Sequence, residues 1–152
     1  GLVPGARLVS VEQRPVEAYL AGELRLPVWA PVYIVLRLRT VNQEPVLLER
    51  YTLPQRRFPD IERFDLGQGS VFDLLEREYG VRICRARQSL EPIIATEYEA
   101  ALLDVLPGAP LMLERRISYD GDGQPVEAGR DLYRGDRFRF VTQMAVPEAI
   151  PG

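Results

Sequence analysis

The segment Ala30–Tyr51, APVYIVLRLRTVNQEPVLLERY, constrains the fold more than any other part of the chain, because it predicts a long antiparallel hairpin. Two runs rich in valine, isoleucine and leucine flank Asn42 and Gln43. Such runs are typical of strands, and a short polar pair between them is typical of a tight turn. A chain with this hairpin is expected to form an antiparallel sheet.

The two faces of the first predicted strand differ in chemistry. Arg37 and Arg39 share one face with Tyr33 and Val35, because side chains alternate along a strand. The opposite face, which we expect to be the core, carries three aliphatic residues: Ile34, Leu36 and Leu38. Two arginines at this spacing present a fork of donors suited to a carboxylate or a phosphate. The alternative is a pair of solvated residues on an open sheet face.

The hairpin register determines whether Glu49, on the return strand, can meet these arginines. With a turn of only Asn42 and Gln43, Arg39 lies opposite Val46 and Glu49 faces away from it. A bulge or a longer loop shifts the pairing by one residue and brings Glu49 to the arginine face. The sequence leaves both arrangements open.

The composition limits the classes of function that this chain can have. The 152 residues are 46% hydrophobic and 27% charged, as expected for one globular domain with a real core. The net charge of −3 and the lack of a basic stripe predict no specific DNA binding by this chain alone. No apolar run is long enough to cross a bilayer and no signal peptide is evident, so we expect a cytoplasmic protein without membrane contact.

Several residue types that carry chemistry are missing. The chain has no histidine, which excludes Ser-His-Asp and Cys-His catalysis and most zinc sites. It has no lysine either, which excludes Schiff-base and P-loop chemistry, and its single cysteine, Cys84, cannot form an internal disulfide. The sequence DGDG at Asp120–Gly123 lacks the further ligands of a calcium loop and predicts a hairpin turn. We therefore expect neither a metal nor a cofactor.

Further strands are predicted from alternating or apolar runs. They cover five segments: Arg7–Gln13, Val81–Ala95, Pro110–Tyr119, Gln124–Tyr133 and Arg137–Val146. Helices are predicted over Pro15–Ala21, between Ser70 and Gly80, and from Thr96, whose capping box with Glu99 opens a helix, to about Val105. We expect residues 55–66 to be a loop or a single helical turn in which Arg56 and Arg57 are solvated.

Ser70 allows two interpretations. As the N-cap of a helix that ends at Gly80, it satisfies a free backbone amide, with Asp73 three residues further on. The same helix end could seat an anion, since free amides, a hydroxyl and the positive end of the helix dipole lie together behind Gly67 and Gly69. A plain cap is the commoner case.

An internal repeat divides the chain into two similar halves. Leu24–Arg37 reads LRLPVWAPVYIVLR, and Leu103–Arg116 reads LDVLPGAPLMLERR. In both, a leucine-rich helix end leads through Ala-Pro into a strand that ends in arginine, and the chain returns through Pro-Val at Pro45 and Pro125. We expect each half to contribute a hairpin to one antiparallel sheet, with ligand clefts between sheet, helices and loops.

The ordered set of motifs resembles the UTRA domain, the effector-binding half of HutC-subfamily GntR-type bacterial transcription regulators. The matching stretches are RLR from Arg37, EP from Glu44, SVFDLLEREYG from Ser70, LLDVLPGAPLMLERRISYDGDGQPVE from Leu102 and YRGDRFRF from Tyr133. The resemblance implies an α+β, chorismate lyase-like fold and one effector-binding and dimerisation domain over residues 1–152. It also implies that a winged-helix DNA-binding domain is missing from this chain.

The resemblance also implies a set of ligand-binding residues. In members that bind phosphosugars, the matching positions contact the ligand: Arg37, Arg39, Glu49, Ser70, Glu127 and Tyr133. Arginines and a helix end can hold an anion, and the glutamates can accept from hydroxyls or an amine. One departure concerns Gly129, where many members have a serine, which predicts a change in ligand polarity.

We therefore expect a sensor of a small anionic metabolite, a phosphosugar or an organic acid, and not an enzyme. DNA contact would come only through the missing N-terminal domain. Two alternatives from other classes are a chorismate lyase-like enzyme, which would share the fold, and a dimerisation module with a vestigial cleft. A homodimer is expected too, with one face of the last predicted strand, Arg137–Val146, as a candidate contact.

Overall fold

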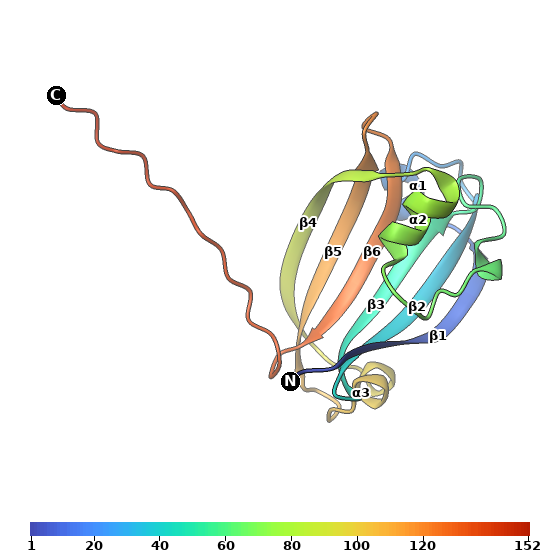
Figure 1. Cartoon of the computed structure of the whole chain (residues 1–152), viewed down its shortest axis with the longest axis horizontal. Helices are drawn as coiled ribbons and strands as arrows, with labels where there is room; N and C mark the ends of the chain where they lie inside the picture. Colours follow the sequence, from blue (N-terminus) through green and yellow to red (C-terminus); the bar gives the residue numbers. More distant parts are fainter.

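The structure, a computed structural model, describes residues 1–152 as one six-stranded antiparallel sheet in the order β1-β2-β3-β6-β5-β4 (Figure 1). The strands are β1 (Pro4–Pro15), β2 (Pro31–Val41), β3 (Glu44–Pro54), β4 (Ile83–Ile94), β5 (Pro110–Asp120) and β6 (Pro125–Arg134). The helices are α1 (Ala18–Glu23), the 3₁₀ turn η1 (Ile61–Arg63), α2 (Val71–Tyr79) and α3 (Glu97–Leu103). No helix is long and apolar enough to span a bilayer. The expected α+β class with a mainly antiparallel sheet is confirmed.

The internal repeat of the sequence corresponds to two halves with the same order of strands and helices. Each half runs strand, helix, strand, strand: β1-α1-β2-β3 and β4-α3-β5-β6. The halves meet where β3 pairs with β6, so β1 and β4 form the two sheet edges. Each hairpin carries a register shift close to its turn, after Arg39 in the first half and after Ser118 in the second. The two halves are therefore similar down to the position of their bulges.

The helix ends follow the predicted capping signals. The Ser70 hydroxyl accepts a hydrogen bond from the Asp73 amide at 3.2 Å, and Gly80 ends α2 in the left-handed conformation. Thr96 and Glu99 form the predicted capping box of α3. The helix predicted over Pro15–Ala21 begins later in the structure, because β1 continues through Pro15 and α1 begins only at Ala18. Local capping chemistry thus located α2 and α3 better than α1, whose Glu17 cap makes no side-chain hydrogen bond.

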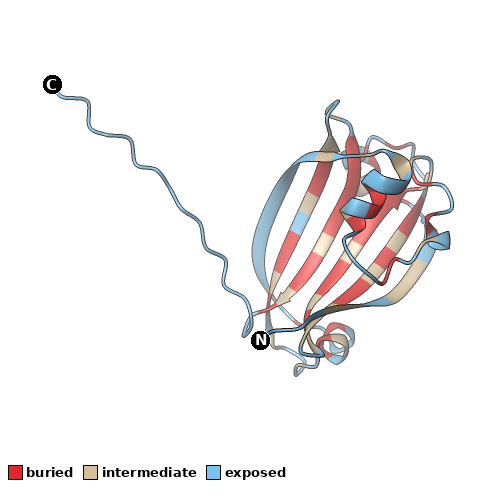
Figure 2. Ribbon diagram, viewed as in Figure 1, coloured by how far each residue is buried: buried red, intermediate tan, exposed pale blue.

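Both faces of the sheet are covered, which corrects the predicted assignment of the hairpin faces. Helix α2 and η1 pack on the face of Tyr33 and Val35, which are 1% and 0% exposed. On the predicted core face Leu38 is buried, at 1% exposed, whereas Ile34 and Leu36 are only half-buried. That second face is covered only towards its two ends, by α1 and by α3 (Figure 2). The arginine face is therefore the better buried one, because a helix crosses its middle.

Two predictions about the surface are wrong. Arg137–Val146 alternates like a strand but forms none, and the chain runs away from the body of the domain (Figure 1). It pairs with no strand of the sheet, and it contacts the domain only near its start, where Phe138 and Phe140 pack on the ring of Tyr133 and Arg137 pairs with Glu44. Arg57 is not solvated, since it donates to Asp120 at 2.9 Å. An alternating sequence forms a strand only where the segment lies beside another strand.

Candidate functional site

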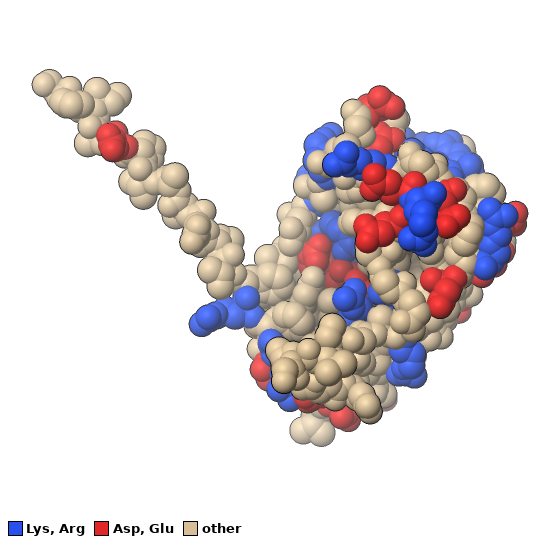
Figure 3. All heavy atoms as spheres, in the orientation of Figure 1, with Lys and Arg blue, Asp and Glu red and all other residues tan.

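The face of the sheet under α2 carries a cluster of charged and aromatic side chains. We call it the α2-face cluster, and its members are Arg37, Arg39, Glu49, Tyr51, Glu114, Arg116, Glu127, Asp131 and Tyr133. Figure 3 shows acidic and basic atoms together in a hollow on this side of the molecule. Four of the residues form one row across four strands, in the order Arg37, Glu49, Asp131 and Glu114. The cluster therefore spans both halves of the sheet.

A β-bulge decides the register of the first hairpin. Asn42 and Gln43 form the two-residue turn with positive φ angles of 50° and 67°, and Val41 pairs with Glu44. The pairing then shifts, so that Leu47 rather than Val46 lies opposite Arg39. As a result Glu49 lies directly opposite Arg37. Of the two arrangements left open by the sequence, the bulged one is present.

Arg37 is the most unusual residue of the cluster. It is 1% exposed, and all three guanidinium nitrogens are buried without a hydrogen-bond partner. Its Nε lies 3.3 Å from Oε1 of Glu49, in a geometry that does not make a hydrogen bond. Arg39 is more exposed and its Nη1 lies 3.8 Å from the same oxygen. A buried guanidinium normally has its donors satisfied, so Arg37 presents free donors inside the protein.

Arg116 is the centre of the second half of the cluster. Its Nε donates to Glu127 and its Nη1 to Asp131, both at 2.7 Å, and Glu114 lies 3.5 Å away. Its guanidinium also lies over the rings of Tyr51 and Phe72, at 5.2 and 5.6 Å from their centroids. In contrast to Arg37, this arginine is fully engaged with protein groups.

Gly129 makes the position of Arg116 possible. It lies across from Arg116 on β6, and the guanidinium passes over it. A Cβ at residue 129 would lie 2.6 Å from Nε of Arg116, closer than such atoms approach. Gly129 therefore determines where the Arg116 guanidinium lies. The sequence predicted only a change in ligand polarity at Gly129, and not this effect on Arg116.

Two tyrosines hold carboxylates of the cluster. Tyr51 donates to Glu49 at 2.9 Å, and Tyr133 donates to Glu114 at 3.0 Å. Burial raises the pKa of both tyrosines, and the neighbouring carboxylates raise it further. Both hydroxyls therefore remain protonated donors at neutral pH.

The carboxylates of the second half are shifted toward their protonated forms. Burial raises the pKa of Asp131 to about 7, although the Arg116 guanidinium opposes the shift. Burial also raises the pKa of the fully buried Glu127, again against Arg116 and a hydrogen bond from Ser118 at 2.7 Å. Burial alone would lower the pKa of Arg116, but its ion pairs with Glu127 and Asp131 outweigh that effect and raise it. The cluster can thus exchange a proton near neutral pH.

The predicted ligand residues fall into three places. Arg37, Arg39 and Glu49 come together on β2 and β3. Glu127 and Tyr133 lie on β6, in the network around Arg116. Ser70 contacts neither group and acts as the N-cap of α2. The first turn of α2 reaches the cluster through Phe72, whose ring centroid lies 6.2 Å from that of Tyr51.

Sequence reasoning missed five members of this neighbourhood: Tyr51, Phe72, Glu114, Arg116 and Asp131. One signal was available for Arg116, which ends the second copy of the repeat as Arg37 ends the first. The acidic residues gave no such signal, because they meet only through the pairing of β3, β6 and β5. No group of three or more histidine, cysteine or acidic side chains in residues 1–152 is placed to hold a metal ion.

Comparisons with known proteins identify the family and the fold of the chain. The sequence matches the UTRA domain family over residues 1–139. It is 33% identical over 144 residues to the HTH-type transcriptional repressor NagR of Bacillus subtilis, covering 95% of this chain and 59% of that repressor. The effector domain of PhnF from Mycobacterium smegmatis superposes with a TM-score of 0.89 at 32% identity, over 95% of this chain and 89% of that one.

A third match extends the comparison. The ligand-binding domain of a GntR-family regulator from Bordetella bronchiseptica has a TM-score of 0.87 at 28% identity, over 94% of this chain and 91% of that one. The chain spans only about 59% of the length of NagR. The family match nevertheless covers residues 1–139, nearly all of the chain, in agreement with the resemblance expected from its motifs. The chain therefore belongs to the UTRA domain family.

Proposed function

We propose that this chain is the effector-sensing domain of a bacterial transcription regulator, and that the α2-face cluster binds a small anionic metabolite. One observation carries the proposal. Arg37 buries three guanidinium nitrogens without an acceptor, and the neighbouring Glu49 supplies only a poorly aligned oxygen. A phosphate or carboxylate in this place would give those donors their missing partners.

Five of the six predicted ligand residues have a direct role in this proposal. Arg37 and Arg39 hold the anionic group, and the Ser70 end of α2 adds free amides and a favourable dipole. Glu49 and Glu127 accept from hydroxyls or an amine of the ligand, each having one carboxylate oxygen buried without a hydrogen-bond partner: Oε1 of Glu49 and Oε2 of Glu127. A phosphosugar or a hydroxylated organic acid has both kinds of group.

The relatives support a regulatory role rather than an enzymatic one. NagR is a transcriptional repressor by name, and the superposed PhnF chain is an effector domain. We infer that DNA contact belongs to an N-terminal winged-helix domain of the whole protein, of the HutC type, and that the regulator acts in the cytoplasm. Effector binding would change DNA affinity by favouring one of two domain arrangements.

We also propose that the regulator is a homodimer formed through this domain. Strand β4 is exposed at ten of its 12 positions and leaves one edge of the sheet unpaired (Figure 2). Val141, Met144 and Val146 are 73%, 87% and 84% exposed on the unpaired segment that follows β6. Long open edges and alternating apolar segments are usually covered in native proteins.

A thermal-shift screen tests the sensing role. Hexose phosphates, amino-sugar phosphates and dicarboxylic acids would be compared at equal ionic strength. A true effector at 100-fold excess over its Kd should stabilise the fold by about 2.7 kcal/mol, a rise in Tm of roughly 5–10 °C. Arg37→Gln and Arg39→Gln should remove the shift, whereas Arg82→Gln, at an exposed site, should keep it. If no acid stabilises the chain, the proposed role is wrong.

A further inference from the structure

The face of the sheet opposite the α2-face cluster contains a polar groove between α1 and α3. Two cavities, of about 370 and 440 Å³, adjoin along it and share Arg130. Leucine-rich cores close the ends of this face, one under α3 and one under α1. The exposed rings of Tyr19 on α1 and Tyr98 on α3 stand beside the groove.

Three arginines lie side by side on the floor of this groove. Arg50 on β3 is directly opposite Arg130 on β6, and Arg130 is directly opposite Arg115 on β5. We call these three residues the arginine row. Neighbouring strands are about 4.8 Å apart, so three positive charges stand next to one another on one face. Like charges directly opposite each other destabilise a sheet unless something neutralises them.

Protein groups neutralise the arginine row only in part. Glu99 lies 3.6 Å from Arg130, but its other oxygen accepts from the Thr96 amide in the capping box of α3. Glu91 meets Arg115 at 3.2 Å, with both side chains about half exposed. Half-buried Arg50 has no ion-pair partner, and only its backbone amide bonds to a carboxylate, that of Asp131. The row therefore keeps an uncompensated positive charge at Arg50.

We propose that the arginine row is a second anion-binding site, for a small molecule with two phosphate or carboxylate groups. Arginine presents paired donors that match such groups. The two outer arginines are two strand spacings apart, roughly 10 Å at the backbone, which suits two linked anionic groups better than one. Arg50 and Arg130 would share one group, and Arg130 and Arg115 the other.

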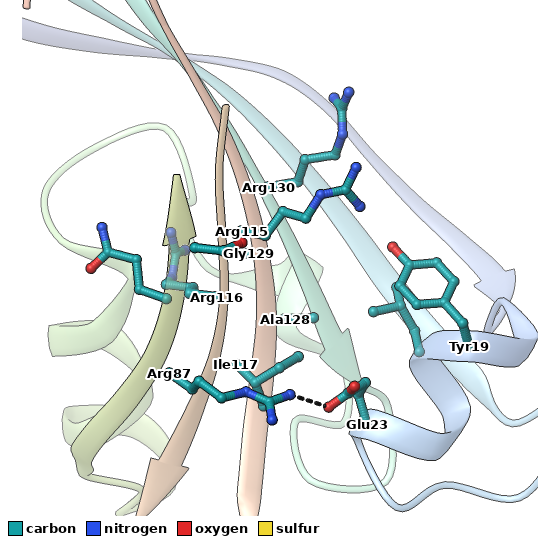
Figure 4. Close-up of a pocket in the computed structure, with 12 residues that line it drawn as sticks. Tyr19, Glu23, Arg87, Arg115, Arg116, Ile117, Ala128, Gly129 and Arg130 are labelled. Atoms are coloured by element: carbon teal, nitrogen blue, oxygen red, sulfur yellow. Dashed lines mark hydrogen bonds and ion pairs between the residues drawn. The ribbon is translucent and has the colours of Figure 1, made fainter. Parts of the chain in front are cut away.

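The arginine row lies on the face of the sheet opposite the α2-face cluster, although Arg116 also lines the cavity of about 370 Å³. Figure 4 shows Arg115 and Arg130 extending on the same side of the sheet as Tyr19, whereas Arg116 points to the other side. Arg87 at the edge of the groove is already paired with Glu23 at 2.8 Å (Figure 4). The two anion sites would thus use different arginines on different strands, which allows them to be tested separately.

Titration with pyrophosphate, followed through the side-chain Nε–H NMR signals of arginine, tests the proposal. We expect saturable shifts for Arg50, Arg115 and Arg130, and at least tenfold weaker binding of inorganic phosphate. Arg50→Gln and Arg115→Gln should each raise the Kd for pyrophosphate about tenfold or more. The matched control Arg82→Gln, at an exposed site away from the groove, should change it less than twofold.

Three results would overturn the second site. The first is an absence of saturable shifts in the arginine row. The second is an equal loss of affinity in the Arg82 control, which would show general electrostatic attraction. The third is dissociation of a dimer in the Arg50 and Arg115 variants without loss of pyrophosphate binding, which would assign the groove to a subunit contact. If Arg50→Gln does not fold, Arg115→Gln, at the more exposed end, tests the same row.

Discussion

Arg37 and Arg116 occupy equivalent positions in the two halves of the sheet, but only the guanidinium of Arg116 is hydrogen-bonded. Each follows the proline that opens its strand by six residues, Pro31 in β2 and Pro110 in β5. Arg116 donates to two carboxylates at 2.7 Å, whereas the three nitrogens of Arg37 have no partner. The arginine of one half is thus bonded to carboxylates of the protein, and the arginine of the other half has free donors for a ligand.

The first prediction concerns the stability of the ligand-free domain. Arg37→Met should lower the free energy of unfolding by roughly 3–5 kcal/mol, because it leaves Glu49 buried beside an apolar group. The double variant Arg37→Met with Glu49→Leu should recover that loss and gain about 1–4 kcal/mol over the wild type. Urea denaturation of the wild type, Arg37→Met, Glu49→Leu and the double variant measures both effects. A double variant less stable than either single variant would contradict the prediction.

The second prediction concerns Gly129. Gly129→Ser should displace the Arg116 guanidinium and lower the free energy of unfolding by about 1–3 kcal/mol, because the new side chain enters occupied space. The matched control is Gly121→Ala, where a Cβ would meet only Cys84 Sγ at an ordinary 3.6 Å. That change should stay within about 0.5 kcal/mol. Equal stability of the Gly129 variant and the wild type would show that Arg116 has another place to go.

The third prediction concerns pH. The pKa of Asp131 is raised in the folded state from 3.8 to about 7, so the folded protein binds more protons than the unfolded chain between these values. The contribution of Asp131 is therefore fully present below about pH 4 and is lost as the pH rises through about 7. Asp131→Asn should remove this decline.

Denaturation at pH 4 to 8 measures the effect of Asp131. The difference in stability between wild type and Asp131→Asn should change by roughly 4 kcal/mol across this range. Asp122→Asn, in the exposed hairpin turn, is the control and should follow the wild-type curve. A parallel curve for the Asp131 variant would mean that this carboxylate does not titrate there.

The fourth prediction separates the two roles of Ser70. Ser70→Ala should lower the free energy of unfolding by about 1 kcal/mol, because the Asp73 amide loses its acceptor. Ser70→Asp keeps a good N-cap and should leave stability near that of the wild type. If the helix end also seats the effector anion, the aspartate will repel it and lower effector affinity at least tenfold. Unchanged affinity in Ser70→Asp would reduce Ser70 to a structural cap.

The fifth prediction concerns assembly. Serine at Val141, Met144 and Val146 together should shift the protein toward monomer in sedimentation equilibrium at micromolar concentration. These side chains are exposed within one chain, so their replacement should not lower Tm. Leu106→Ser, at an 80% exposed site in the loop after α3, is the control. A wild-type protein that is monomeric throughout would refute the dimer itself.

The sequence alone led to the hairpins, the caps of α2 and α3, the two-fold repeat and the family. These features depend on neighbours in the chain: turn residues at Asn42 and Asp120, a hydroxyl at Ser70, a capping box at Thr96. Such local interactions act whatever the rest of the fold does. The family resemblance, rather than these local interactions, placed Arg37, Arg39 and Glu49 in one set of ligand residues.

Only the tertiary structure decided which face of β2 is buried deeper, because that depends on where α2 crosses the sheet. It also decided that a bulge turns Glu49 toward Arg37, and that 137–146 has no strand beside it. The partners of Arg116 and the arginine row come from strands far apart in the chain, brought together by the pairing of β3 with β6. Local patterns determined the elements of this protein, and long-range pairing determined which charges meet.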